Sequence, residues 1–438
     1  MSTLYLCEKP NQAKDLADAI GVVGRRTGYI EVRGGIVTWA FGHMLEQASP
    51  DAYDEKWGGR WTFDVLPMIP PEWKHSVVTN KGQQLKVIRG LLKSAREVII
   101  ATDAGREGEL IAREILEHCA YRGPVRRFWT SSLVKSDIVK ALNSLRPGSE
   151  TEPLYEAALA RARSDWLYGM NGSRAVTLAV RHSGSAYPVG RVQTATLALV
   201  VRREWEIRNF VPQVYYELEA TVRSAGGEEF LMFHSPAENE RIKSRLEAER
   251  LKASADGAKS PLTVIKKSEK ESPPLPYSLP TLQKDANRML GLSASKTLQQ
   301  AQALYEAHAI TYPRTDCTFL AASQKGEIEE TLSRLAQVYE GEVEKLKGMG
   351  VTARPSTFDD AKLTDHHAIV PTREAVAPPE GTAQLFGLIS ERYLKTLAPD
   401  CHFDRTTVTL DANGVPFKAT GKRITQEGFR AIRIISRR

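Results

Sequence analysis

A tyrosine and an arginine stand two positions apart in Ala309–Asp316, which reads Ala-Ile-Thr-Tyr-Pro-Arg-Thr-Asp. A phenol oxygen can act as a nucleophile, and a guanidinium beside it can bind an anion such as a phosphate. Apolar residues at helical spacing precede the stretch, and a residue before proline is biased away from helical geometry. We therefore expect a helix that ends before Tyr312 and a tyrosine that is presented outward on a stiff turn. The other interpretation is a half-buried tyrosine next to a surface arginine.

Acidic residues follow two apolar stretches that we predict to be buried strands of an α/β sheet. Glu8 follows Leu4–Cys7, and Asp103 and Glu107 follow Val98–Ala101. Ligands of such sheets collect at the carboxyl ends of strands, and Mg²⁺ prefers oxygen ligands, so acids that converge there suit a magnesium site. Alternatively, they are ordinary loop and helix-cap residues, since Asp and Glu favour the first turn of a helix.

The composition narrows the class of protein. A chain of 438 residues with 42% hydrophobic residues is long enough for two to four domains. No apolar run approaches the ~20 residues of a membrane span, and the N-terminus lacks the features of a signal peptide. The four cysteines are far apart, so neither a zinc ribbon nor a disulfide framework is indicated. The net charge of +7 is compatible with nucleic acid. We expect a cytoplasmic protein that is associated with the nucleoid and not with a membrane.

Segments spread from residue 5 to about residue 372 resemble, in the family's own order, motifs of type IA DNA topoisomerases, and of the bacterial topoisomerase III branch in particular. The first two resemble a Toprim domain, and the stretch around Tyr312 resembles the active-site tyrosine motif. The segments are Glu8-Lys9-Pro10, Thr102–Glu109, Arg161–Asn171, Val189–Thr194, Pro273–Gln283, His308–Asp316 and Asp365–Thr372.

This resemblance implies a multidomain ring of α/β and α+β class, with an N-terminal Toprim domain and with helical and β-rich arch domains. The family has a further C-terminal segment that completes the arch and the helical base, and we expect this return segment to be lacking. A fragment, a truncated form and half of a split enzyme all remain open. The expected domains are 1–150 (Toprim), 151–212 (first segment of the helical base), 213–272 (first segment of the β-rich arch), 273–400 (active-site tyrosine domain) and 401–438 (incomplete return segment of the arch).

Local patterns add further expectations about these regions. Alternating residues predict a strand over Tyr215–Val222, and residues 241–272 are typical of an exposed helix followed by a linker. Residues 406–417 predict a hairpin. One face of an amphipathic helix is predicted from Ile328, Leu332, Leu335 and Tyr339. The tryptophans of residues 39–73 can stack nucleic-acid bases, but we expect them to fill a core or support an insertion.

The resemblance also implies roles for the reacting groups. Tyr312 becomes the nucleophile. Because its ordinary pKa is near ~10, it needs nearby positive charge and a positioned phosphodiester. Arg314 and Lys9 contact the phosphate, and Glu8 protonates the leaving 3′ oxygen. The implied cofactor is Mg²⁺, which is held by Glu8, Asp103 and Glu107.

A DNA-binding role follows from the resemblance for five residues: Arg161, Asp165, Arg191, Gln193 and His366. Each of these residues also has a structural alternative. Arg161 and Asp165 are four positions apart and can form a surface ion pair of small stabilising value. The residues around Gln193 can be the solvated start of a helix, and a single histidine such as His366 can have a purely structural role.

The implied activity is that of an ATP-independent DNA topoisomerase, which cleaves one strand through a 5′-phosphotyrosine, passes a strand and religates. Relaxation of negative supercoils and decatenation both follow from it. The implied partners are single-stranded or underwound DNA, and either a missing C-terminal segment or a helper helicase. The alternative is a catalytically impaired single-strand DNA-binding protein, because Gly105 stands where the family has a second acid. Another Toprim enzyme, such as a primase, leaves the Tyr312 motif unexplained.

Overall fold

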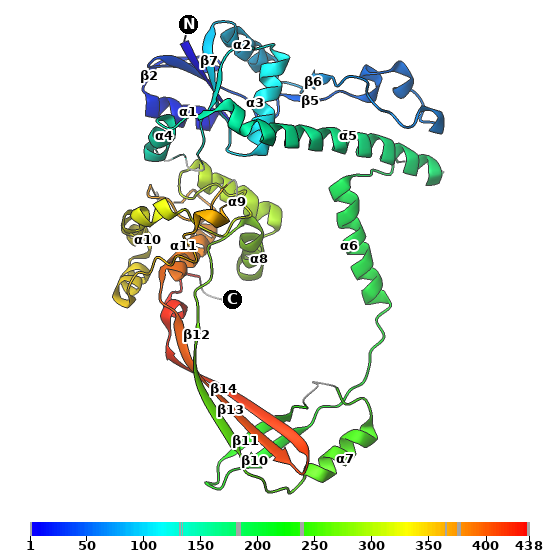
Figure 1. Cartoon of the computed structure of the whole chain (residues 1–438), viewed down its shortest axis with the longest axis vertical. Coiled ribbons are helices and arrows are strands. Elements are labelled where there is room, and N and C mark those ends of the chain that lie inside the picture. The colour runs from blue at the N-terminus through cyan, green and yellow to red at the C-terminus, as the bar shows by residue number, and fades with distance from the viewer. Residues whose placement is uncertain are drawn as a thin grey trace.

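The computed structural model describes residues 2–130, 133, 135–180, 185–236, 241–363, 366–374 and 378–435, so Asp365 of the last motif lies outside the described residues. In Figure 1 the ribbon follows a ring. An α/β domain is at the top, and one long helix extends sideways from it. A second long helix runs down one side, a small β-rich region is at the bottom, and a helical domain leads back to the α/β domain.

The α/β domain is built on a seven-stranded sheet. Its strands are β1 (Ser2–Cys7), β2 (Val22–Arg26), β3 (Tyr29–Val32), β4 (Gly35–Trp39), β7 (Ala95–Ala101), β8 (Val125–Arg127) and β9 (Arg146–Pro147). Their order is β2-β3-β4-β1-β7-β8-β9, and β1 runs parallel to both of its neighbours. The predicted strands over residues 4–7 and 98–101 are therefore confirmed. Because β1 and β7 are parallel neighbours, their carboxyl ends lie side by side.

Helices cover both faces of this sheet. They are α1 (Pro10–Ile20), α2 (Gly82–Leu92), α3 (Arg106–His118) and α4 (Lys135–Leu142). Leu6 and Ile100 pack with α2 and α3, whereas Ile99 packs with α1 and α4. Successive strand residues point to opposite faces, so an unbroken apolar run is what a strand buried on both sides requires.

An arm between β4 and α2 carries three of the seven tryptophans, Trp57, Trp61 and Trp73. It contains the short strands β5 (Leu45–Gln47) and β6 (His75–Val77) and packs along α5 (Glu152–Val180). The rings of Trp73 and Tyr53 lie 5.7 Å and 5.5 Å from that of Trp166 on α5. The expected packing role of these tryptophans is confirmed.

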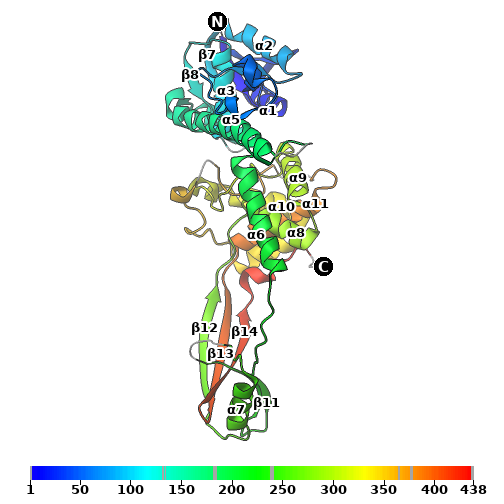
Figure 2. The ribbon, with the colours of Figure 1, turned by 90° about the vertical axis from the view of Figure 1, so that its right-hand side faces the viewer.

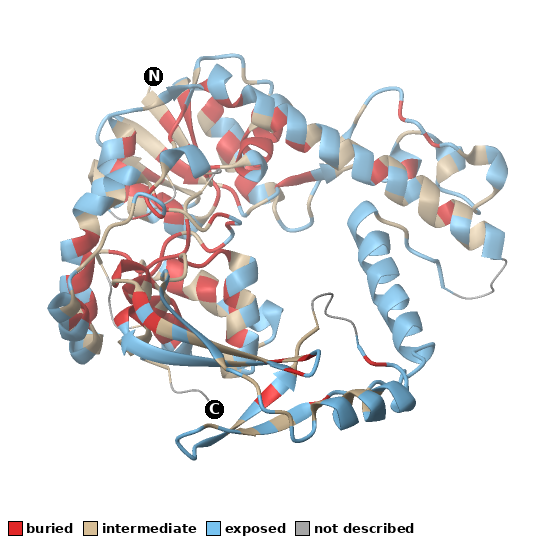
Figure 3. Cartoon of the chain, turned by 60° about the horizontal axis from the view of Figure 1, so that its bottom comes forward, coloured by how far each residue is buried: buried red, intermediate tan, exposed pale blue. Residues whose placement is uncertain are grey.

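After α5 the chain turns into α6 (Arg191–Arg208), which runs down one side of the ring (Figures 1 and 2). None of the residues of α6 is buried. Figure 3 shows this helix exposed along its length, while buried residues gather in the α/β and helical domains. The exposed apolar residues of α6 include Val192, Leu197, Leu199, Val200 and Trp205.

The β-rich region is a five-stranded sheet in the order β10-β11-β14-β13-β12. Its strands are β10 (Glu219–Arg223), β11 (Glu229–His234), β12 (Thr263–Glu271), β13 (Cys401–Ala412) and β14 (Val415–Gln426). The predicted hairpin is present, and Asn413 and Gly414 at its tip both have the positive φ of a type I′ turn.

Two expectations about this region need correction. Residues 263–271 are not a linker but strand β12, which pairs with β13 over its whole length. Most side chains of β12 are exposed, so backbone hydrogen bonds to β13 keep it in the sheet. For the same reason its sequence has no alternation of apolar residues that would predict a strand. The strand expected from Tyr215 begins only at Glu219. The expected exposed helix is α7 (Arg245–Ala255).

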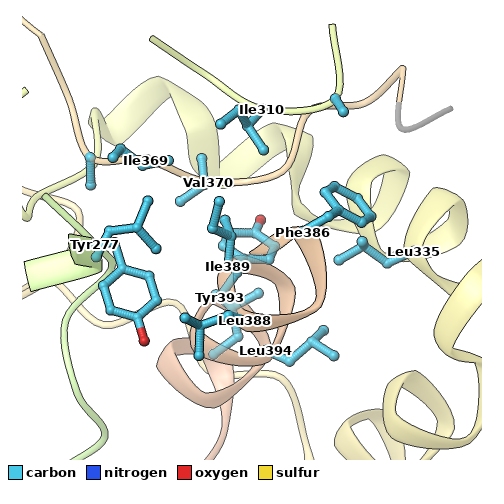
Figure 4. Close-up of a cluster of buried hydrophobic side chains, with 14 of the residues drawn as sticks. Tyr277, Ile310, Leu335, Ile369, Val370, Phe386, Leu388, Ile389, Tyr393 and Leu394 are labelled. Atoms are coloured by element: carbon cyan, nitrogen blue, oxygen red, sulfur yellow. The ribbon is translucent and has the colours of Figure 1, made fainter. Parts of the chain in front are cut away.

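The helical domain packs around one buried helix. Its helices are α8 (Leu279–Leu290), α9 (Ala294–Glu306), α10 (Ile328–Met349) and α11 (Ala383–Leu397). Figure 4 shows Phe386, Ile389 and Leu394 of α11 among side chains from the surrounding segments. Ile328, Leu332 and Leu335 on α10 are buried, as predicted, whereas Tyr339 is only partly buried and has non-helical backbone angles where the helix kinks.

Candidate active site

Tyr312 lies on an extended segment that follows α9. The helix ends at Glu306, as predicted. The Thr311 N–H donates to the Val370 carbonyl at 3.0 Å, and the Val370 N–H donates to Thr311 Oγ1 at 3.0 Å. We call residues 308–315 and 366–373 the tyrosine ribbon. Its two segments are antiparallel, so the motif around Tyr312 and the motif around residue 370 are one structural unit.

Glu8, Lys9 and Asp103 meet at the adjoining ends of β1 and β7. Lys9 Nζ lies 3.3 Å from Glu8 Oε1 and 3.2 Å from Asp103 Oδ2. The Asp103 N–H donates to Glu8 Oε2 at 3.3 Å, and Gln12 Nε2 donates to Asp103 Oδ1 at 3.3 Å. One lysine thus bridges two carboxylates, which we call the acid pair.

The acid pair changes how its own groups hold protons. Burial raises the pKa of Glu8, and the negative charge of Asp103 raises it further, although Lys9 opposes both. Burial acts to lower the pKa of Lys9, but the two carboxylates outweigh it, so the pKa of Lys9 is raised. These shifts favour a proton on Glu8 and a positive charge on Lys9.

Tyr312 faces the acid pair. Burial raises the pKa of its phenol, and the negative charges of Asp103 and Glu8 raise it further. Arg314 acts to lower this pKa, whereas a hydrogen bond to Asp103 also raises it. The expectation that Tyr312 is presented outward is wrong, because the α/β domain covers this part of the ribbon and the side chain is partly buried. Arg314 itself is exposed.

His366 completes the surroundings of Tyr312. The two rings have centroids 4.5 Å apart. His366 Nε2 also lies 3.7 Å from the position that a Cβ on Gly105 would take, so this histidine sits over the start of α3. The structure therefore brings Tyr312, His366, Glu8, Lys9 and Asp103 together from two domains.

Arg127 is a buried support that we did not identify from the sequence. Its Nε lies 2.5 Å from Glu109 Oε1, and its guanidinium donates to the carbonyls of Thr102 at 2.8 Å and Asp103 at 2.6 Å. The side chain is fully buried beneath the end of β7. The sequence did contain one signal for this role, because Arg127 is a charged residue at the end of β8, a strand in the interior of the sheet.

Gly108 allows the start of α3 to lie directly against the loop that carries Asp103. A Cβ at this position would lie 2.0 Å from the Asp103 carbonyl oxygen. Only glycine allows the first turn of α3 to approach the end of β7 this closely. The approach fixes the backbone of Asp103 relative to α3.

Glu107 lies apart from the acid pair. Its carboxylate is 3.4 Å from His43 Nε2 and 3.7 Å from Arg161 Nη1. Asp165 continues this run, 3.9 Å from Arg161 and 2.7 Å from Arg191 at the start of α6. The ion pair of Arg161 and Asp165, which the sequence offered only as the alternative to DNA binding, is present and belongs to an exposed series of charged contacts between α3 and α6.

Gln193 is exposed in the first turn of α6 and is not brought to the acid pair. Among the residues that the structure describes, no group of three or more His, Cys, Asp or Glu side chains is placed to hold a metal ion. The expected set of Glu8, Asp103 and Glu107 is therefore not assembled. The acid pair alone fits Mg²⁺, which commonly takes one or two carboxylates and completes its shell with waters and phosphate oxygens.

Comparison with known families agrees with this geometry. A Toprim domain profile matches residues 3–133. A DNA topoisomerase profile matches residues 149–437, which include the tyrosine ribbon. The chain belongs to the DNA topoisomerase family. The match confirms the assignment that the ordered motifs made, and Toprim domains generally bind Mg²⁺.

Relatives of this topoisomerase family member cover nearly all of it. DNA topoisomerase 3 of Bacillus subtilis (strain 168) is 36% identical over 438 residues, 98% of this chain and 59% of the relative. That of Shouchella clausii (strain KSM-K16) is 37% identical over 434 residues, 97% of this chain and again 59% of the relative. The chain thus spans about three fifths of these curated relatives.

A solved structure supports the fold. Full-length topoisomerase I from Thermotoga maritima matches with a TM-score of 0.70 and 24% identity, over 99% of this chain and 68% of that one. The Toprim, helical and β-rich parts of this topoisomerase chain therefore have the fold that the motifs implied. Among the described residues, no helix has both the length and the apolar character to cross a membrane.

The pair of His43 and Glu107 predicts a pH dependence in this topoisomerase chain. The hydrogen bond to Glu107 raises the pKa of His43 although burial opposes it, and His43 in turn lowers the pKa of Glu107. The pair is therefore complete below the ordinary histidine pKa of about 6.5 and is lost as the pH rises through the raised value.

We expect an NMR titration of the His43 ring, assigned with His43→Gln, to have its midpoint above 6.5. Glu107→Gln should lower this midpoint, while Glu114→Gln, whose charge acts on His43 more weakly, should change it less. A midpoint that is indifferent to Glu107→Gln would contradict the pairing.

Proposed function

We propose that the chain carries the strand-cleaving and rejoining centre of an ATP-independent type IA DNA topoisomerase. One observation carries the proposal: the phenol of Tyr312 faces Glu8, Lys9 and Asp103 across a boundary between two domains. Reversible cleavage of a DNA phosphodiester needs a nucleophile on one side of the phosphate, and a general acid and a cation on the other.

In the cleavage step the Tyr312 oxygen attacks a DNA phosphorus and the bond to the 3′ oxygen breaks. Asp103, which accepts a hydrogen bond from the phenol, is placed to take the phenol proton. Glu8, whose raised pKa favours its acid form, gives a proton to the leaving 3′ oxygen. Lys9 and Arg314 contact the phosphate. Rejoining is the reverse, and the ester conserves the bond energy, so ATP is not required.

Glu8 and Asp103 would hold Mg²⁺, and its charge would offset the repulsion between these carboxylates and DNA phosphate. Lys9 already neutralises part of the charge of the acid pair. We therefore propose that cleavage by Tyr312 relies on the charge of Lys9, and that bound Mg²⁺ would help to order the DNA for rejoining. Glu107 is then a residue that positions Arg161 and His43.

The single strand would reach Tyr312 along the exposed charges between α3 and α6. Arg161 and Arg191 are held by acids, which fixes their side chains for contact with phosphates. Gln193, which is exposed in the first turn of α6, and His366 beside Tyr312 are the remaining proposed DNA contacts. Relaxation of negative supercoils and decatenation are the proposed outcomes.

The proposed partners and location follow from the substrate. Single-stranded DNA arises where a helicase opens a duplex, so a helicase is the proposed helper. The segment that the relatives have beyond the matched part is the other proposed partner of this site, since the chain spans 59% of them. The proposed place of action is the cytoplasm, at the nucleoid. The alternative of an impaired single-strand DNA-binding protein is not favoured, because Tyr312 and the acid pair are both present and face each other.

The test is transfer of a label from a single-stranded oligonucleotide to the protein after quenching with denaturant. Because the tyrosine retains the 5′ phosphate, we expect a 3′-end label to become covalently attached and a 5′-end label to be released. Tyr312→Phe should abolish the adduct, while Tyr305→Phe, a buried neighbour, should keep it. Equal labelling of the intact chain and Tyr312→Phe would refute the proposal.

Gly105 provides a test of the metal site. Its φ of 168° is extended backbone, and a Cβ there has ordinary contact distance to His366. Gly105→Asp therefore fits, and it adds a carboxylate beside the acid pair. We expect calorimetric titration to give Mg²⁺ affinity several-fold tighter than in the unchanged chain.

Gly105→Asn is the matched control, because it has the same size and also caps α3 but carries no charge. Its Mg²⁺ affinity should remain that of the unchanged chain. An equal response of the two variants, or none in either, would remove the carboxylate argument.

A further inference from the structure

The tyrosine ribbon is fastened to the α/β domain at the end away from the reacting groups. Arg373 Nη2 lies 2.7 Å from Asp137 Oδ1 on α4 and 2.9 Å from Ser136 Oγ. His308 Nε2 lies 3.4 Å from Asp15 Oδ1 on α1. These contacts cross the same domain boundary as Tyr312 does, but none of them touches the acid pair.

We propose that Arg373 and His308 are positioning residues that form a two-point latch, which sets how readily the tyrosine ribbon separates from the α/β domain. The latch would govern strand passage and leave cleavage itself nearly unchanged. This inference rests on the proposed function, because strand passage requires a cleaved strand whose two ends move apart.

Separation at this boundary follows from where the two DNA ends would be held. After cleavage, one end is bonded to Tyr312 on the ribbon and the other lies beside Glu8 and Lys9 on the α/β domain. A strand can pass only if the ribbon moves away from these residues. Esterification removes the phenol proton that Tyr312 donates to Asp103, so this contact is lost in the cleaved state. The latch does not depend on that proton and remains to hold the boundary.

Arg373 is the stronger point of the latch. Its side chain is only 17% exposed, so solvent screens its ion pair with Asp137 less than it screens a surface pair. Glu327 of the helical domain lies 3.6 Å from the same guanidinium. Burial raises the pKa of Glu327, Arg373 lowers it and Asp137 raises it, so the two carboxylates act on each other across the boundary. Removing Arg373 therefore replaces attraction with repulsion between the domains.

His308 fixes the neighbouring strand of the ribbon. Its φ is 60°, an uncommon value for a residue with a side chain, and the Thr372 hydroxyl donates to its carbonyl. This backbone places the ring toward α1. The hydrogen bond to Asp15 raises the pKa of His308, although burial and Lys14 act in the other direction, which favours the charged form of the pair.

The first readout is the opening of the boundary in the full chain, without DNA. Dyes are attached to cysteines introduced at two exposed positions, Lys93 in the α/β domain and Gln337 on α10, after Cys119→Ser. The other native cysteines are buried. We expect single-molecule energy transfer to show a several-fold larger open fraction in Arg373→Gln, a smaller increase in His308→Gln, and partial recovery in Arg373→Lys.

Arg288→Gln is the matched control. It removes an arginine whose ion pair, 2.9 Å with Asp285, lies within α8 and does not cross the boundary. Its open fraction should equal that of the unchanged chain. Open fractions that are equal in Arg373→Gln, His308→Gln and Arg288→Gln overturn the latch.

The second readout is the covalent adduct on a single-stranded oligonucleotide, which needs no strand passage. We expect Arg373→Gln to form it within about twofold of the unchanged chain. Adduct formation that falls in parallel with opening would assign these residues to cleavage and overturn the inference. If the unchanged chain forms no adduct, the proposed function fails, and the energy-transfer experiment still decides whether the latch exists.

Discussion

Two carboxylates sit side by side at the ends of parallel strands, and the rest of the site depends on how their charge is compensated. Glu8 and Asp103 are held close by a backbone hydrogen bond and share one ammonium, that of Lys9. Unpaired, such charges would be costly to take out of water. Arg127 adds a second positive charge from below, through the backbone of Asp103. Burial and the charge of Asp103 outweigh the opposing effect of Lys9, so the pKa of Glu8 is raised, which is the property of a general acid.

The proposed nucleophile, Tyr312, belongs to another domain, and this is the second constraint. The phenol of Tyr312 reaches the acid pair only while the tyrosine ribbon lies against the α/β domain. Its own hydrogen bond to Asp103 helps to hold it there and also keeps its proton. In the proposed mechanism, chemistry and domain contact are thus coupled, because cleavage transfers to Asp103 the phenol proton on which this contact depends.

Much of this arrangement was predictable from residue types. The apolar runs before Glu8 and Asp103 are parallel strands with adjacent ends, and the helix does end before Tyr312, although it stops at Glu306, ahead of the residue that Pro313 restricts. Two things were not accessible. The burial of Tyr312 depends on a domain contact that its local pattern does not encode. The ladder that forms β12 joins residues at least 130 positions apart and leaves no apolar pattern.

For the expected metal site, membership of a motif was a poorer predictor of which residues lie together than the structure itself. Glu107 shares a motif with Asp103, but one helical turn directs it to His43 and Arg161. Arg127 shows the opposite case, since it lies outside the motifs and yet fixes the loop of Asp103.

The central claim is that Tyr312 forms the bond to DNA. Mass spectrometry of peptides from a complex quenched on a single-stranded oligonucleotide tests it most directly. The account predicts a nucleotide joined through its 5′ phosphate to the peptide that contains Tyr312, with fragment ions placing the added mass on that tyrosine. Added mass on Tyr305 or any other residue, or an unmodified Tyr312 peptide from a sample that carries DNA, would contradict it.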